Sequence, residues 1–197
     1  TMRFNDGTER GGAIYFFSGA EGTIDNVEFN TNTSARGGAI NVFKSIPSIE
    51  SSTFIGNSST NSGGAILFSD SANTTIEGSR FIGNISNSGG AIYSQFTSDI
   101  IYTGNSEGTV LNCSFSGNNA VIGGGIRAQS NSDFAITNTI LWGNSTEIST
   151  DLNTDAIVSF SCVEGGFAGA NNLDINRFFF NQPYVASEQD TVVFLSF

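Results

Sequence analysis

The sequence predicts an all-β fold, a right-handed single-stranded parallel β-helix of about six coils. Three observations predict it. A Gly-Gly-Ala-Ile string recurs every 26 residues, a second β-rich block recurs between the strings, and neither shows a 3.6-residue apolar period. A repeat of this length made only of short strands suits one turn of a solenoid, in which each coil stacks its inward side chains on the coils beside it. Adjacent coils lie about 4.8 Å apart, so six coils form a rod on the order of 30 Å long.

The Gly-Gly-Ala-Ile string opens one strand of each coil. Four full copies are followed by a shortened Gly-Gly-Ile copy, which comes after an interval that is eight residues longer. The isoleucines of the string are expected to stack as one inward column. This column consists of Ile14, Ile40, Ile66, Ile92 and Ile126.

The second block supplies two more inward columns, and we expect Phe4 to begin the second of them. The first column holds Ile24, Ile49, Ile76, Val110 and Ile136, and the second holds Phe29, Phe54, Phe81, Phe115 and Leu141. Between the columns a tight bend is predicted at Asn26, Ser51, Gly78, Asn112 and Asn138. Each block ends three residues later at Asn32, Asn57, Asn84, Asn118 or Asn144. Stacked Asn side chains are expected to hydrogen-bond along the rod.

Composition excludes several classes of function. The chain has 7 Lys+Arg against 18 Asp+Glu, and a net charge of -11 leaves no basic stripe for a nucleic acid or an anionic bilayer. Histidine is absent, which excludes Ser-His-Asp and Cys-His relays and imidazole-ligated metal sites. No apolar run approaches the ~20 residues that a membrane span requires. We expect a solenoid domain over residues 1–176 and an apolar C-terminal segment over residues 177–197, serving as a cap or an inter-subunit strand.

The alternation of Phe-x-x-Asn with Gly-Gly-Ala-Ile resembles the repeat of the polymorphic outer membrane proteins, which are surface autotransporters, and more broadly of secreted right-handed parallel β-helix proteins. Residues 138–144 and 160–173 are similar to the closing coils of the latter group. The resemblance covers about residues 4–180. It implies surface display, and hence an extracellular or cell-surface location.

Outward apolar residues are the first candidate site. Tyr15, Phe17, Phe43, Leu67 and Tyr93 are expected to point away from the core. Such a patch would stack on sugar rings, pack against another copy of the chain, or lie under the insertion at residues 94–107. The C-terminal residues Phe194, Leu195 and Phe197 are the candidates for joining subunits end to end, because an open solenoid end needs a cap or a partner.

A column of carboxylates is the second candidate. Asp25, Glu50 and Glu77 would repel one another unless water or a cation such as Ca²⁺ lies between them. A solvated strand face is favoured over a metal site, so no cofactor is expected. With Arg80, the same column resembles the Ca²⁺-plus-Arg sites of polysaccharide lyases built on this fold.

The cysteines and the sequons give two smaller predictions. Cys113 and Cys162 fall two coils apart and at different phases, beyond the ~7 Å Cα limit for a disulfide, so free and mostly buried thiols are expected. Asn57, Asn84 and Asn144 begin sequons on one corner column, which would place glycans in a line.

These observations favour a non-enzymatic extracellular structural or adhesive protein that self-associates, with filaments as one outcome. The alternative is a carbohydrate-binding or lyase-like β-helix protein centred on Glu50, Glu77 and Arg80. Glycans are possible partners in either case, whereas nucleic acid is not expected.

Overall fold

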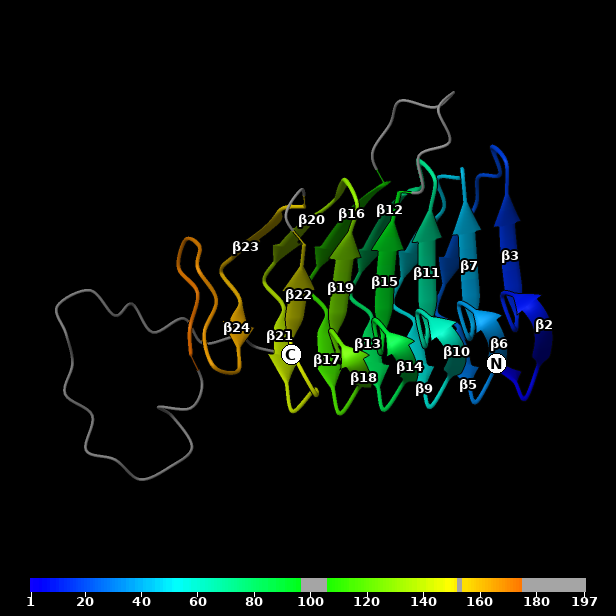
Figure 1. Cartoon of the computed structure of the whole chain (residues 1–197), viewed down its shortest axis with the longest axis horizontal. Coiled ribbons are helices and arrows are strands. Elements are labelled where there is room, and N and C mark those ends of the chain that lie inside the picture. Colours follow the sequence, from blue (N-terminus) through cyan, green and yellow to red (C-terminus); the bar gives the residue numbers. More distant parts are fainter. Residues whose placement is uncertain (97–105, 152–153, 175–197) are drawn as a thin grey trace, which may run out of the picture.

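The chain forms a parallel β-solenoid of about six turns in the computed structural model, which describes residues 1–96, 106–151 and 154–174 (Figure 1). The described residues contain 24 strands and no helix. All pairings between these strands are parallel, and the coils follow one another along the long axis. The predicted parallel β-solenoid is therefore confirmed. No helix with the length and apolar character needed to cross a membrane occurs in the described part of the chain.

Four sheets, labelled A to D, line the sides of the solenoid. Each turn of the chain contributes one strand to sheet D, then one each to sheets A, B and C. Sheet A contains β1 (Met2–Arg3), β5 (Glu28–Asn30), β9 (Thr53–Ile55), β13 (Arg80–Ile82), β17 (Ser114–Ser116), β21 (Ile140–Trp142) and β24 (Cys162–Val163). Sheet B contains β2 (Asp6–Arg10), β6 (Thr33–Arg36), β10 (Ser58–Ser62), β14 (Ile85–Ser88) and β18 (Asn119–Ile122).

The other two sheets have six strands each. Sheet C contains β3 (Ile14–Phe17), β7 (Ile40–Phe43), β11 (Ile66–Ser69), β15 (Ile92–Gln95), β19 (Ile126–Gln129) and β22 (Ile148–Thr150). Sheet D contains β4 (Thr23–Asp25), β8 (Ser48–Glu50), β12 (Asn73–Glu77), β16 (Ser106–Leu111), β20 (Ser132–Thr137) and β23 (Ala156–Ser159).

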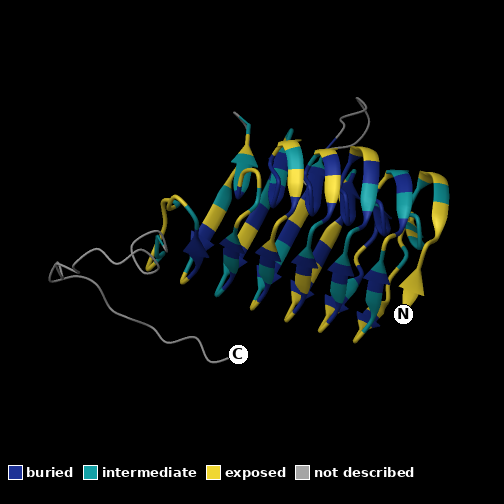
Figure 2. Ribbon diagram, turned by 90° about the horizontal axis from the view of Figure 1, so that it is seen from below, coloured by how far each residue is buried: buried dark blue, intermediate teal, exposed yellow. Residues whose placement is uncertain are grey.

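The predicted inward columns are confirmed by the strand register. In sheet C the isoleucines of the Gly-Gly-Ala-Ile string pair with one another from Ile14 to Ile126. In sheet D the column runs from Ile24 to Ile136 and continues to Val158. Figure 2 shows buried residues recurring at matching positions of successive coils.

The phenylalanine column forms a stack of nearly parallel rings in sheet A. Successive ring centroids lie 4.8, 4.7 and 4.6 Å apart along Phe29, Phe54, Phe81 and Phe115, which are fully buried. The spacing between coils imposes this arrangement of the rings. Burial of each ring removes apolar surface from water and stabilises the folded chain by about 2 to 3 kcal/mol.

The prediction that Phe4 begins this column is wrong. Met2 pairs with Phe29, whereas Phe4 is 74% exposed and has a φ of 52°. The first coil therefore differs by two residues from the phase that we expected, because Met2 rather than Phe4 lies in register.

The predicted bends are confirmed by the backbone angles. The column from Asn26 to Asn138 has φ between 47° and 58°, in the left-handed region. A second bend precedes each Asn of the Phe-x-x-Asn motif, where Thr31, Gly56, Gly83, Gly117 and Gly143 have φ between 55° and 66°. Side chains that tolerate these angles thus recur at the same two corners of every coil.

The Gly-Gly dipeptide of the repeat is required for two separate reasons. Gly63 has a φ of +65°, and a Cβ at that position would lie 2.3 Å from the carbonyl oxygen of Ile66. Gly64 has ordinary backbone angles, but a Cβ there would lie 2.1 Å from the carbonyl oxygen of Gly90 in the next coil. The first glycine therefore serves the turn and the second serves the close approach of coils.

The motif asparagines form a hydrogen-bonded ladder, as predicted. The backbone N–H and the Nδ2 of each Asn donate to the Oδ1 of the Asn in the next coil, from Asn5 through Asn144. From Asn57 to Asn144, Nδ2 also donates to a phenylalanine carbonyl of the preceding coil, as Asn84 does to Phe54 at 3.0 Å. The side-chain amides of Asn57, Asn84 and Asn118 thus join their coils to both neighbouring coils.

The cysteines are free and buried, as predicted. Cys113 belongs to a second ladder, otherwise made of hydroxyls, in which Ser79 Oγ and Cys113 Sγ each approach the carbonyl oxygen two residues earlier at 3.0 Å. Cys162 lies in β24, two coils further along the solenoid. It is one residue past the ladder position, which Ser161 occupies in that coil. Burial raises the pKa of the Cys113 thiol to about 12 and that of Cys162 to about 11.

Candidate functional site

Three aromatic side chains, two exposed and one half-buried, gather on the outer face of sheet C in the first two coils. Tyr15 and Phe17 project from β3, and Phe43 projects from β7. Tyr15 is 37% exposed and Phe17 is 57% exposed, whereas Phe43 is half-buried. The sequence predicted these three residues as outward-facing, and the structure brings them together.

The rings form a continuous surface. Phe17 stacks on Phe43 with centroids 5.4 Å apart and planes inclined by 9°, which continues the coil spacing outside the core. Tyr15 is tilted by 57° against Phe17 at 5.5 Å. The stack ends at Phe43, because Ser69 occupies the same column in the next coil.

Two cations border these rings. The Arg10 guanidinium lies 5.7 Å from the centroid of Tyr15 and 5.5 Å from that of Phe43, and its Nη1 donates to the Tyr15 hydroxyl at 2.8 Å. Lys44 Nζ lies 5.0 Å from the Phe43 centroid. These are the distances of cation–π contacts. We refer to Arg10, Tyr15, Phe17, Phe43 and Lys44 as the aromatic–cation cluster.

The prediction that Leu67 and Tyr93 belong to this exposed surface is wrong. Leu67 is 1% exposed and Tyr93 is 5% exposed, although both share a column with Tyr15. This column lies in a crease between sheets B and C, where Asn41 donates to the carbonyl of Arg36 at the end of β6. Burial raises the pKa of the Tyr93 hydroxyl, which lies within hydrogen-bond distance of Gln95 and Gln129.

Two other predictions fall on residues outside the described ranges. Phe194, Leu195 and Phe197, the candidates for joining subunits, lie there with the rest of residues 175–197. Residues 97–105 of the insertion that was expected to cover the aromatic surface lie there as well.

The acidic column is present, but its members do not converge. Asp25, Glu50 and Glu77 are in register in sheet D and exposed. Glu77 accepts a hydrogen bond from Asn112 at 3.2 Å, whereas Arg80 lies in sheet A with Thr53 and Ser114 as its register partners. Within the described residues, no three Cys, Asp or Glu side chains come close enough to hold a metal ion.

A shallow depression lies on the other side of the turn that carries Lys44. Its rim joins sheet D to the segment between β7 and β8, and the Ser48 hydroxyl donates to the Thr23 hydroxyl at 3.0 Å within it. The lining residues are Glu21, Gly22, Thr23, Ile46, Pro47, Ser48, Asn73 and Thr75.

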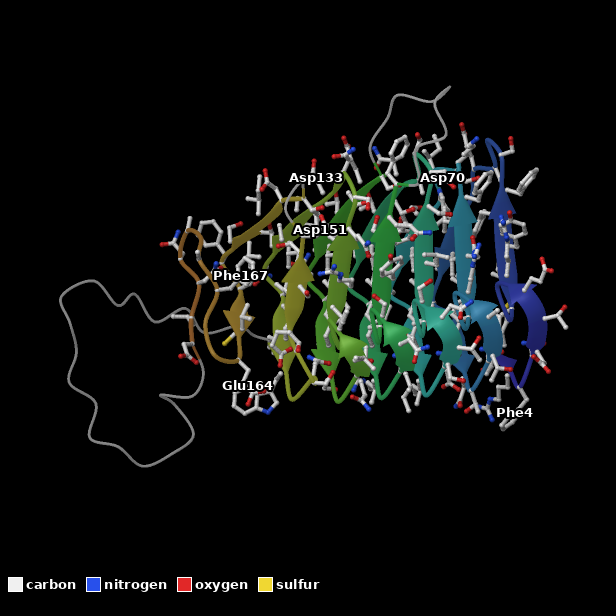
Figure 3. The ribbon with its side chains drawn as sticks, viewed as in Figure 1. Phe4, Asp70, Asp133, Asp151, Glu164 and Phe167 are labelled. Atoms are coloured by element: carbon white, nitrogen blue, oxygen red, sulfur yellow. The ribbon has the colours of Figure 1, made fainter. Side chains whose placement is uncertain are left out.

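A buried carboxyl group closes the Asn ladder at its C-terminal end. Glu147 Oε1 accepts from the backbone N–H of Asn144 at 3.1 Å, and Oε2 accepts from Asn144 Nδ2. Burial raises the pKa of Glu147 to about 7 against these hydrogen bonds, and the neighbouring Glu164 adds to the rise. Glu164 lies beside β24 in Figure 3 and accepts from the N–H of Gly143 at 2.7 Å.

The predicted glycan column does not agree with the folded coil. Asn57 and Asn84 are fully buried, and the Nδ2 atom that a glycan would occupy donates two hydrogen bonds in each. Asn144 is half-buried, and its Nδ2 donates to Phe115 and Glu147. The column faces into the solenoid because the bend before each Asn turns its side chain inward.

Sequence reasoning missed Arg10, Lys44 and Glu147. Arg10 lies 26 residues before Arg36, which is one repeat period, and the two residues are in register. The repeat period could therefore have predicted that Arg10 lies beside the crease. Glu147 stands in the last coil, where the repeat is lost, and no sequence pattern marks it.

A protein-family model matches part of the chain. The model of the Chlamydia polymorphic membrane protein repeat matches residues 51–69 and 78–95, two successive copies of the repeat. This confirms the predicted resemblance for those two coils. No curated protein and no solved structure was found to match the chain.

Proposed function

We propose that this chain is a non-enzymatic protein of the cell surface or extracellular space that acts by contact, as an adhesive or structural rod. The match to the polymorphic membrane protein repeat supports a surface β-helix protein. The aromatic–cation cluster is the observation that carries the proposal of contact. Exposed apolar patches of this kind commonly mark binding surfaces.

The remaining side-chain arrangements favour contact over catalysis. Glu50 and Glu77 lie exposed on a flat sheet face, with Arg80 on a different sheet. A lyase-like centre would need these groups to converge on one sugar ring, at hydrogen-bond distance from the reacting atoms.

The test is the binding of the full chain to an array of glycans and to cultured cells. A Tyr15→Ser/Phe17→Ser double variant is expected to lose most of the binding of the wild-type chain. Phe4→Ser is the matched control, because Phe4 is an exposed aromatic residue that belongs to a different sheet edge. Equal binding by the double variant would refute the proposed contact surface.

Self-association is a second form of contact for the same rod. Sedimentation velocity over a concentration series tests it directly, and a larger species that disappears in the double variant would identify the cluster as the joining surface. A strictly monomeric profile at all concentrations would leave adhesion to other molecules as the proposed function.

A further inference from the structure

The aromatic–cation cluster contains a positive charge that the described chain does not neutralise. Carboxylates outnumber cations by 18 to 7 in this sequence, yet no described carboxylate forms an ion pair with Arg10. Its guanidinium instead lies over Tyr15 and Phe43, with one N–H on the Tyr15 hydroxyl. A guanidinium held in this way presents its other N–H groups to a planar anion, for which its fork geometry is suited.

A flat apolar surface lies beside this charge. Phe17 is 57% exposed and is fixed by its stack on Phe43. A ring with an apolar face can lie against it at little entropic cost, because the aromatic side chains are already packed against one another. The ligand class that matches both features is a ring that has one apolar face and carries a carboxylate.

A depression lies on sheet D, the side of the solenoid that follows sheet C along the chain. The turn that follows Phe43 and carries Lys44 also supplies Ile46 and Pro47 to the depression, where hydroxyls of Thr23 and Ser48 face one another. Hydroxyl-rich walls suit the hydroxyl groups of a sugar chain. Glu21 in the same wall repels a carboxylate, so the depression suits a neutral sugar and disfavours the acidic end of such a ligand.

We propose that the aromatic–cation cluster binds an acidic oligosaccharide, with a uronate carboxylate on the Arg10 guanidinium and the sugar ring against Phe17. The proposal rests on the proposed function, since it names the ligand class of the same contact surface. Lys44 Nζ lies over the ring of Phe43 in the same cluster. An acidic protein segment, including the Asp25–Glu50–Glu77 column of a second copy, matches the charge but does not use the open face of Phe17.

The experiment compares hyaluronan oligosaccharides with the same oligosaccharides after reduction of their carboxylates to alcohols, by calorimetric titration of the full chain. Only the first probe carries the uronate charge. We expect hyaluronan binding to weaken at least tenfold in Arg10→Gln and in Phe17→Ser. Arg80→Gln and Phe4→Ser, at an exposed arginine and an exposed phenylalanine of sheet A and its N-terminal edge, are expected to change it less than twofold.

The reduced probe separates charge from ring contact. Its affinity is expected to fall with Phe17→Ser and to stay unchanged with Arg10→Gln. Equal affinity of the wild-type chain for both probes, or unchanged hyaluronan binding in Arg10→Gln, would overturn the acidic-sugar assignment. So would self-association that requires Arg10 together with no binding of either probe, which would instead identify a second copy as the acidic partner.

Failure of the ligand class is distinguishable from failure of the contact surface. If neither probe binds while cell or array binding still depends on Tyr15 and Phe17, the sugar assignment is wrong and the proposed function stands. If binding to the glycan array and to cells does not depend on Tyr15 and Phe17, both the sugar assignment and the proposed contact surface are wrong. Circular dichroism of each variant verifies the β-solenoid.

Discussion

Asn84 and Asn118 are joined by two hydrogen bonds across adjacent coils. The backbone N–H and the Nδ2 of Asn84 both donate to the Oδ1 of Asn118, at 3.0 and 2.9 Å. Since both residues are buried, the Asn84 backbone N–H and one of its two Nδ2 hydrogens would lose their acceptor if the ladder were interrupted, while Nδ2 would keep its bond to Phe54. The ladder therefore makes the stability of each coil depend on the coil that follows it.

Asn84→Ala is expected to destabilise the chain by about 3 kcal/mol or more, because two buried hydrogens of Asn57, its backbone N–H and one N–H of Nδ2, lose their acceptor at a cost of about 1 to 3 kcal/mol each. Urea denaturation measures the change. Asn61→Ala, at an exposed position of β10, is expected to stay within about 0.5 kcal/mol. Similar losses in the two variants would contradict a structural role for the ladder.

Phe81→Ala is expected to cost about 3 to 5 kcal/mol, because it opens a cavity between two stacked rings of the core. Arg80→Ala, the neighbouring exposed residue, serves as the control and is expected to change stability by less than about 0.5 kcal/mol. Thermal unfolding followed by circular dichroism is sufficient for the comparison. A change below about 1 kcal/mol for Phe81→Ala would contradict the stacked column.

Two glycine variants separate lack of space from backbone strain. Gly64→Ala places a Cβ 2.1 Å from the carbonyl oxygen of Gly90. We therefore expect the free energy of unfolding to fall by about 3 kcal/mol, the upper end of the usual range for overpacked cores. Gly83→Ala meets no atom within 4 Å but keeps a φ of +60°, so a smaller cost of about 1 kcal/mol is expected. The reverse order in denaturation midpoints would refute the close approach of coils at Gly64.

Stability is expected to fall as the pH rises through about 7, because of Glu147. Its pKa is raised from an ordinary 4.5 to about 7, so the folded chain binds the proton more tightly than the unfolded chain does. This contribution to stability is fully present below about pH 4.5, is lost progressively as the pH rises to about 7, and is absent above that. The measurement is the urea midpoint between about pH 4.5 and 8.

Glu147→Gln is expected to flatten this pH profile, since the variant has no carboxyl group to titrate at the end of the ladder. Glu50→Gln, at an exposed carboxylate of sheet D, is expected to keep the wild-type slope. The chain has no histidine to add a transition in the same range. A wild-type slope in Glu147→Gln would assign the pH dependence to another group.

The thiols are expected to react slowly with iodoacetamide at pH 8 in the folded chain and rapidly in urea. Burial keeps both protonated, with a pKa of about 12 for Cys113 and about 11 for Cys162. Cys113→Ser is expected to fold with little loss of stability, because Ser52 and Ser79 occupy the same ladder. Mass spectrometry counts the labels, and fast labelling of the folded chain would contradict the buried register.

The repeat period was sufficient to predict the solenoid, its three inward columns and its bends, because every coil imposes the same backbone path on the next. It failed for Phe4, since the first coil departs from the phase of the others. It failed for Leu67 and Tyr93 for a different reason. Alternation along a strand tells which way a side chain points, but not whether neighbouring segments cover it, and Leu67 and Tyr93 are buried on the outward side of their strands.

The candidate site was predicted in part. The three aromatic residues follow from alternation in the strands after Gly-Gly-Ala-Ile, whereas the cations do not. Arg10 belongs to the strand of another sheet, and its contact with Phe43 crosses from one coil to the next. Glu147 occupies a place that an Asn of a further coil would fill, and only the register of the ladder makes this visible.

The Asn ladder gives the rod an electrical direction. Backbone N–H and C=O groups of parallel strands alternate and nearly cancel, but the side-chain carbonyls of the ladder all point toward the N-terminal coil. Their dipoles add, as peptide dipoles do in a helix, with the positive end at Asn144. Glu147 places a carboxyl group at that pole, in the manner of an acidic cap on the first turn of a helix, and the opposite pole lies at Asn5.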